Sequence, residues 1–292
     1  MIGRYISGNG KVHEFVHTYQ HYFNCALVGT FNVQLDGNPP ALRPCIEHDA
    51  EVHRRFWLVK LDGQHYAWSV RWDGSKMPLN RLELVSKTPL PDYLKYQPFS
   101  VEMLEPLTAE ERQRWVEAQR YWFQSFSWGP KRADSALIWQ TICTHAPWHN
   151  ASVLDIGCAN GAHCFYASRS GAHVVGFEPD KEAREKGIFI NDHIEMQDVR
   201  MVDADPGGVF DHIFYFSVHH QWDERYDHLK EKMDELRSRC RSKLFVELIV
   251  PDLQRTRSLD WIDTQVGGRI LLEYSHKVRK IRRIYEVQGE AQ

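Results

Sequence analysis

The residues from Val153 to Gly161 carry the clearest chemical pattern in the chain. They read Val-Leu-Asp-Ile-Gly-Cys-Ala-Asn-Gly, a short apolar strand followed by a turn with glycines at both ends. Glycine lets the backbone turn sharply, so a ligand can approach the backbone closely where the strand ends. The spacing differs from the G-x-G-x-x-G dinucleotide fingerprint, and the turn holds no lysine to neutralise a phosphate. A ligand without a pyrophosphate therefore fits this turn better.

An acidic residue follows the next apolar segment. Glu178 comes directly after Val174–Phe177 and lies 23 positions after Asp155. At the end of a second parallel strand, a carboxylate can accept hydrogen bonds from both hydroxyls of a ribose. The turn and the acid together predict a site for a nucleoside-containing cofactor.

This arrangement resembles the class I methyltransferases that use S-adenosylmethionine, over about residues 120 to 287. The resemblance includes Phe210–Asp211 and a hairpin-like ending from Leu271 to Val287. It implies that the glycine turn faces the amino acid part of the cofactor, that Glu178 holds the ribose, and that an acid after the third strand contacts the adenine. The expected cofactor-binding residues are Asp155, Gly157, Cys158, Ala159, Gly161, Glu178, Asp198, with Asp203 as its rival, and Ser217.

Two neighbouring histidines follow the predicted fourth strand. Methyl transfer from a sulfonium is an in-line displacement at carbon, helped by positioning and by removal of a proton from the acceptor. His219 and His220 lie where this strand ends, so one of them can serve as the base, oriented by Asp223 or Glu247. The alternative is that the pair only caps the strand and shapes the pocket. Adjacent histidines diverge, so they do not predict a metal site.

Two segments suggest a closer relationship within the methyltransferases. Phe126–Pro130 and Ser217–His220 resemble segments of the tRNA wobble-uridine modifying enzymes and of the methyltransferase halves of bacterial polysaccharide chain terminators. These two groups act on different acceptors, so the resemblance leaves the acceptor open.

The N-terminal part resembles another family. Gly3–Lys11, a helical stretch to Phe23, and Val28–Leu35 resemble the archaeal CTP-dependent riboflavin kinases, which are small β-barrels, over roughly residues 2 to 92. The resemblance implies that a loop wraps the nucleotide phosphates, that a strand binds Mg²⁺, and that a late strand supplies the base. These roles fall on Gly8 and Gly10 for the loop, Thr30 and Asn32 for the metal, and Glu83 for the base. The alternative is a barrel that only binds or packs.

The intervening residues indicate how the elements are organised. Segments such as Phe56–Leu61 and His65–Val70 are rich in β-formers, whereas four prolines between Thr88 and Pro106 predict a connector. Thr108 and Glu111 form a capping box that opens a helix. Apolar runs alternating with helices then predict a parallel sheet covered on both faces. The expected architecture is an α/β Rossmann-like methyltransferase domain at 120–292, preceded by a mostly β barrel at 1–95 and a linker with a helix at 96–119.

Composition limits the other possibilities. The 292 residues are 42% hydrophobic and 26% charged, enough for two globular domains, and the formal charge is −3. Because there is no excess of basic residues, the sequence disfavours a nucleic acid partner. Six scattered cysteines predict free thiols, and neither a membrane span nor a secretory signal is evident. The expected location is the cytoplasm.

These features lead to one main prediction and two alternatives. The main prediction is a bifunctional enzyme that phosphorylates a hydroxyl of a glycan or small polar metabolite with CTP and Mg²⁺, and transfers a methyl group from S-adenosylmethionine to that phosphate or to a neighbouring group. The first alternative is a single-activity methyltransferase whose barrel only recognises the substrate, perhaps an RNA. The second is a sensor that binds both cofactors without turnover.

Overall fold

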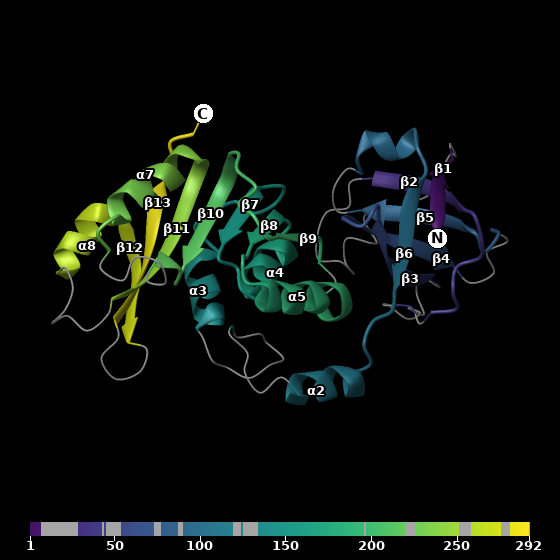
Figure 1. Cartoon of the computed structure of the whole chain (residues 1–292), viewed down its shortest axis with the longest axis horizontal. Coiled ribbons are helices and arrows are strands. Elements are labelled where there is room, and N and C mark those ends of the chain that lie inside the picture. The colour runs from purple at the N-terminus through teal and green to yellow at the C-terminus, as the bar shows by residue number, and fades with distance from the viewer. Residues whose placement is uncertain are drawn as a thin grey trace. The chain divides into compact units, whose positions relative to one another are not determined.

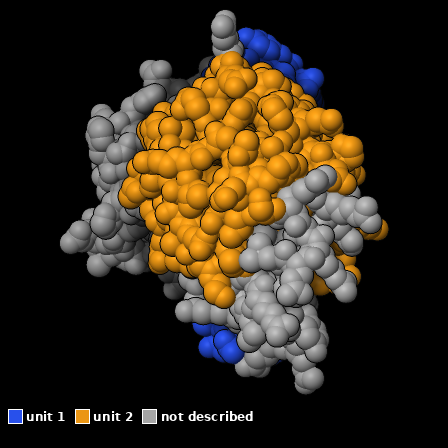
Figure 2. Space-filling model, turned by 90° about the vertical axis from the view of Figure 1, so that its left-hand side faces the viewer, with its two compact units in different colours: residues 1–118, 169–171, 189–198 blue, residues 119–168, 172–188, 199–292 orange. Residues whose placement is uncertain are grey.

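A computed structural model gives the fold of most of the chain. It describes residues 1–6, 29–42, 44, 54–72, 77–86, 90–118, 124, 134–195, 197–219, 226–250, 258–275 and 281–291. The chain forms two compact units, coloured separately in Figure 2. Unit 1 comprises residues 1–118, 169–171 and 189–198, and unit 2 comprises residues 119–168, 172–188 and 199–292. Within the described residues, none of the helices is both long and apolar enough to cross a membrane.

Unit 1 contains a closed β-barrel (Figure 1). Its strands, in their order around the barrel, are β1 (Ile2–Tyr5), β2 (Gly29–Leu35), β5 (Arg81–Ser86), β4 (His65–Trp72), β3 (Arg54–Leu61) and β6 (Phe99–Leu104). All strand pairs are antiparallel. Alternate residues such as Phe31, Val33 and Leu84 form one apolar cluster, as the two-residue period of a strand requires. The predicted mostly β N-terminal region is confirmed.

The proline-containing stretch differs from the predicted connector. Residues 99–104 form β6, which closes the barrel by pairing with both β1 and β3. A short 3-10 helix, η2 (Asp92–Lys95), precedes it. Prolines interrupt a ladder only where they lie, and Pro98 and Pro106 lie just outside β6. The capping box is confirmed: Thr108 N donates to Glu111 Oε2 at 2.7 Å and Glu111 N donates to Thr108 Oγ1 at 3.1 Å, opening α2 (Ala109–Ala118).

Unit 2 is built on one seven-stranded sheet (Figure 1). Its strands, in spatial order, are β12 (Arg269–Ser275), β13 (Ile281–Gln288), β11 (Cys240–Val250), β10 (Phe210–Phe216), β7 (Ser152–Ile156), β8 (His173–Phe177) and β9 (Val199–Val202). The run from β11 to β9 is parallel, and β13 is antiparallel to both of its neighbours. The order reverses beside β7, where open α/β sheets bind ligands. This is the predicted Rossmann-like fold.

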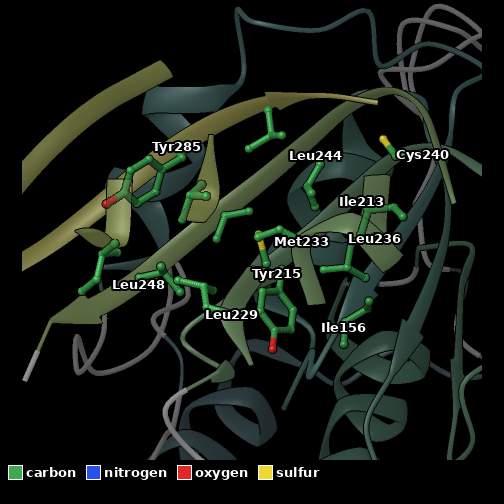
Figure 3. Packing of buried hydrophobic residues seen from close by; sticks show 14 of the residues in the cluster. Ile156, Ile213, Tyr215, Leu229, Met233, Leu236, Cys240, Leu244, Leu248 and Tyr285 are labelled. Carbon is green, nitrogen blue, oxygen red and sulfur yellow. The ribbon is translucent and has the colours of Figure 1, made fainter. Parts of the chain in front are cut away.

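Helices pack against both faces of this sheet. They are α3 (Ser135–Ile142), α4 (Ala162–Arg169), α5 (Lys181–Ile190), α7 (Leu229–Ser238) and α8 (Leu259–Val266). The π-helix η3 (Asn191–Glu195) belongs to unit 1. Leu154 and Ile156 of β7 join the apolar cluster of α7 and α8, which Figure 3 shows around Met233. Asp155, between them, accepts a hydrogen bond from Cys164 of α4 on the other face. The alternation along β7 therefore buries both faces of the strand.

Candidate functional site

The turn after β7 has the backbone conformation that its glycines allow. Gly157, Ala159 and Gly161 have φ angles of +70°, +48° and +86°. A Cβ atom on Gly157 would lie 2.4 Å from Cγ2 of Val218, so no larger residue fits without a shift. The turn is fixed by Gly157 N, which donates to the carbonyl of Phe177 at 2.8 Å. The backbone is therefore open to close approach by a ligand at the carboxyl end of β7.

Glu178 lies beside this turn, directly after β8. Its Oε2 accepts from the backbone N–H of Ala159 at 2.8 Å, and its Oε1 accepts from Asp180 N at 2.9 Å. Each carboxylate oxygen can accept more than one hydrogen bond, so the group is held in place and still has lone pairs for a ligand. The structure thus brings Gly157, Ala159 and Glu178 together, as the sequence predicted.

The turn and Glu178 line a cavity of about 570 Å³, within the size range of small-molecule sites. Three consecutive strands contribute side chains from one row to its wall: Phe177 pairs with Ile156 on β7, and Ile156 pairs with Tyr215 on β10. The remaining lining residues come from the loop after β8, from α5, from the segment after β10, and from α7. They are Pro179, Asp180, Ala183, Val218 and Lys232.

Asp155 and Cys158 lie behind the turn. Asp155 is 2% exposed, and its Oδ2 accepts from Cys164 Sγ at 3.2 Å. Burial raises the pKa of this carboxyl to about 7, against the lowering effect of the Cys164 hydrogen bond. Cys158 is fully buried. Both residues therefore support the turn from the interior, and neither belongs to the cavity wall described above.

The position of Asp198 does not fit its predicted role. The third strand of this half is β9, which begins at Val199, so Asp198 lies at its amino end. Ligands of such sheets bind at the carboxyl end. Asp203, the rival candidate, follows β9 directly and lies 3.9 Å from Arg184 Nη2 through its Oδ2. The sequence misplaced the strand because β9 is only four residues long and one of them is Arg200.

Ser217 belongs to a buried polar cluster at the ends of β10, β11 and β13. It has a φ of +57°, and its hydroxyl donates to Oε2 of the fully buried Glu247. Arg282 Nη1 donates to Ser217 Oγ at 3.0 Å and to Glu247 Oε1 at 2.6 Å. Tyr274 donates to the same carboxylate at 3.0 Å, and burial beside Glu247 raises the pKa of its hydroxyl. Glu247 therefore orients Ser217, whereas the sequence suggested either Glu247 or Asp223 as the residue that orients a histidine.

The structure describes only the first of the two histidines that follow β10. His219 is fully buried, and its Nδ1 lies 3.1 Å from the hydroxyl of Tyr215. Its ring also packs at 4.9 Å from the ring of Tyr226. His220 and Asp223 lie outside the described residues. Tyr215 lines the cavity and His219 does not, so His219 is linked to the cavity through Tyr215.

The barrel candidates can be located only in part. Asn32 and Glu83 are 7% and 8% exposed and lie opposite each other on β2 and β5. The backbone of Thr30 pairs with Val85 in the same ladder. Gly8 and Gly10 lie outside the described residues. Asn32 and Glu83 are thus paired residues on two adjacent strands of the barrel.

Three residues near the site were missed by sequence reasoning. Tyr215 reaches the cavity from β10, and Arg282 joins Ser217 from a strand 65 positions later. Gln124 is 6% exposed, and its Oε1 accepts from Ala162 N at 2.7 Å, at the first residue of α4. Only Tyr215 had a detectable signal, because it falls two positions before Ser217 on a predicted strand.

Comparisons with known proteins agree with the fold of unit 2. Residues 145–275 match a family model described as a methyltransferase domain, so the C-terminal half contains a methyltransferase domain. The tRNA U34 carboxymethyltransferase of Shewanella woodyi is 26% identical over 226 residues, covering 70% of this chain and 66% of the relative. That of Actinobacillus succinogenes is 30% identical over 126 residues, covering 40% and 39%. The chain spans about two thirds of the length of the first of these relatives.

Solved structures that are similar to this chain have low sequence identity to it. Magnesium protoporphyrin IX methyltransferase from Synechocystis, solved with bound SAH, has a TM-score of 0.48 and 13% sequence identity. The match covers 62% of this chain and 95% of that one.

The relatives correct two predictions. The predicted bifunctional enzyme, with a CTP- and Mg²⁺-dependent kinase acting on a glycan or metabolite, is wrong, because the relatives are named for one group transfer to a tRNA. The expectation that a nucleic acid is disfavoured as the partner is wrong for the same reason, and the relatives agree better with the alternative of an RNA-modifying methyltransferase. Net charge misled here, because a formal charge summed over the whole chain says nothing about local basic surfaces.

Proposed function

We propose that unit 2 is an S-adenosylmethionine-dependent transferase that modifies a base of tRNA, and that the barrel of unit 1 takes part only in substrate binding. The observation that carries this proposal is the open turn at Gly157–Gly161 with Glu178 fixed beside it, on one wall of a cavity of about 570 Å³. The tRNA acceptor follows from the names of the relatives. A cytoplasmic location is part of the same proposal.

The residues of the turn fit such a cofactor. The backbone of Gly157 and Ala159 offers a surface without side chains, and Glu178 offers acceptor lone pairs for the two ribose hydroxyls. The cavity wall is otherwise mostly apolar, with Ile156, Phe177 and Val218 excluding water. When bound, S-adenosylmethionine supplies an electrophilic carbon on its sulfonium. The chain then has to orient the acceptor in line with that carbon and remove its proton.

Arg282 favours a second form of this function, the transfer of a carboxymethyl group. The relatives are named carboxymethyltransferases, and a carboxymethyl donor carries an extra carboxylate. Arg282 is 11% exposed, and its Nε is buried with no hydrogen-bond partner. Because Nη1 is held by Glu247 and Ser217, the Nε edge of the guanidinium is free to bind a carboxylate side-on. The polar cluster would hold Arg282 in the required orientation.

Two measurements test the proposal. Calorimetry with S-adenosylhomocysteine should show binding to the full-length protein. Incubation with bulk bacterial tRNA and either S-adenosylmethionine or its carboxymethyl-sulfonium analogue, followed by mass analysis of the nucleosides, should show a modified uridine with one of the two donors. A glycan mixture serves as the control acceptor and should remain unmodified. No heat with S-adenosylhomocysteine, together with unmodified tRNA, would refute the proposed function.

A further inference from the structure

Tyr215 is the one hydroxyl-bearing side chain among the described residues that line the cavity, and it is linked to a buried histidine. It lies on β10, and its oxygen is 3.1 Å from Nδ1 of His219. Both residues are fully shielded from bulk solvent. In Figure 3 the hydroxyl of Tyr215 points away from Met233. The pair therefore connects the cavity to a titratable group behind its wall.

The position of Tyr215 in the sheet separates it from the ribose-binding residue. Phe177, Ile156 and Tyr215 lie side by side on β8, β7 and β10. Adjacent strands are about 4.8 Å apart, so Tyr215 is about 10 Å from the β8 end of this row, where Glu178 follows. A ligand whose sugar is bound by Glu178 reaches Tyr215 only with a part beyond the sugar. Tyr215 is thus placed for the reacting end or the acceptor.

We infer that Tyr215 is a catalytic residue that takes the acceptor proton, and that His219 accepts the proton of Tyr215 in turn. This inference rests on the proposed function and assigns the missing base of that reaction. His219 is not among the residues that line the cavity, so it acts on an acceptor through Tyr215, which does line it. The sequence pattern alone pointed to His219 or His220 as a direct base, whereas the geometry makes Tyr215 the contact and His219 the proton store.

The proposed step moves two protons, forms one bond and breaks one bond. The acceptor proton passes to the Tyr215 oxygen while the Tyr215 hydroxyl proton passes to Nδ1 of His219. The acceptor atom forms the bond to the donor carbon, and the carbon–sulfur bond breaks with its electron pair remaining on sulfur. One positive charge is lost at the sulfur and one appears on His219, so the net charge of the site is unchanged.

Three charged side chains are among the described residues that line the cavity, and a second tyrosine packs on His219. Glu178 and Asp180 face the cavity from the β8 side, and Lys232 faces it from α7 with its Nζ bound to Glu235 at 2.6 Å. Tyr226 packs on the ring of His219 and donates its own hydroxyl to the carbonyl of Ile249. The phenol of Tyr226 thus donates to the backbone, whereas the hydroxyl of Tyr215 lies at hydrogen-bond distance from His219.

The kinetic test compares Tyr215→Phe with Tyr285→Phe. Both tyrosines are fully buried in the same apolar cluster, but Tyr285 donates to Asp263 at 2.8 Å and does not line the cavity. Tyr215→Phe should lower kcat about 100-fold or more with little change in the donor KM. In the wild type, kcat should fall at low pH, because protonated His219 no longer accepts a proton; this fall is the acid limb of the pH profile. Tyr215→Phe should remove the acid limb. Tyr285→Phe should keep the wild-type pH profile. An unchanged acid limb in Tyr215→Phe would overturn the inference.

A second measurement does not depend on catalysis. ¹⁵N NMR of imidazole-labelled protein, saturated with S-adenosylhomocysteine, reports which ring nitrogen of His219 carries the proton. The inference requires an unprotonated Nδ1 above the midpoint of the acid limb, and a shift of its resonance in Tyr215→Phe. A protonated Nδ1 at that pH would refute the relay even if no acceptor is found. Wild-type protein that fails to bind S-adenosylhomocysteine refutes the proposed function instead, so the two failures are distinguishable.

Discussion

Each unit buries a carboxylate on a strand, and the two carboxylates have different surroundings. Asp155 of unit 2 lies behind a turn with three left-handed residues, and a cavity opens on the other side of that turn. Glu83 of unit 1 lies opposite Asn32 in the middle of an antiparallel ladder of a closed barrel. Both were predicted to be functional from short local patterns. Only Asp155 lies in a region where the ends of several strands meet.

The difference shows what makes a buried acid informative. In a parallel sheet the carboxyl ends of the strands meet at one edge, so turn, acid and fourth-strand residues converge whatever their distance in sequence. A barrel ladder places Asn32 beside Glu83 for reasons of register alone. A buried carboxylate is therefore weak evidence for catalysis until a cavity and a second strand end accompany it.

The largest expected effect concerns the ionisation of Asp155. With its pKa raised to about 7, the native chain holds this proton more tightly than the unfolded chain, so the free energy of unfolding should fall as the pH rises from about 4 to about 7. Asp155→Asn should remove this slope, which amounts to at most about 4 kcal/mol. Urea unfolding at several pH values measures it. Glu182→Gln, on an exposed position of α5, is the control and should keep the wild-type slope; equal slopes in all three proteins would contradict the burial argument.

A smaller but still large effect is expected from Gly157→Ala. The added Cβ meets Val218 at 2.4 Å in a left-handed conformation, so the turn should close on the cavity and weaken S-adenosylhomocysteine binding about 100-fold. Gly207→Ala is a matched control, because Gly207 has a similar φ of +63° with no atom within 4 Å of an added Cβ. Calorimetry on both variants should show loss of affinity in the first alone.

The sequence predicted most of the site residues that lie at the ends of the parallel strands. The β7 turn, Glu178 and the fourth strand could be predicted because an apolar run, a glycine pair and an acid recur at fixed places in such sheets. Asp198 was assigned to the wrong end of β9 because four residues give too weak a strand signal. Arg282 could not be predicted, because its contact with Ser217 depends on β13 inserting antiparallel beside β11. Long-range pairing of this kind leaves no local pattern.

Glu178→Gln should have a moderate effect on binding. The amide keeps one oxygen for the N–H of Ala159 but replaces the other with a donor. That donor would face the N–H of Asp180, and it could not accept a hydrogen bond from a ribose hydroxyl. We expect about a tenfold loss of S-adenosylhomocysteine affinity by calorimetry. Glu185→Gln, on an exposed position of α5, provides the control. If Glu178→Gln bound as tightly as wild type, the ribose role of this residue would be wrong.

The smallest effect is expected in the barrel, where Glu83→Gln should leave transfer to tRNA unchanged. A residue that only completes the packing between β2 and β5 contributes to stability and not to the barrier of a reaction in unit 2. Glutamine has nearly the same shape as glutamate and remains polar, so the barrel should remain folded. Melting curves check the fold, and mass analysis of tRNA nucleosides checks the activity. A loss of transfer with an unchanged melting temperature would mean that Glu83 takes part in the reaction, and would remove the contrast between the two buried acids.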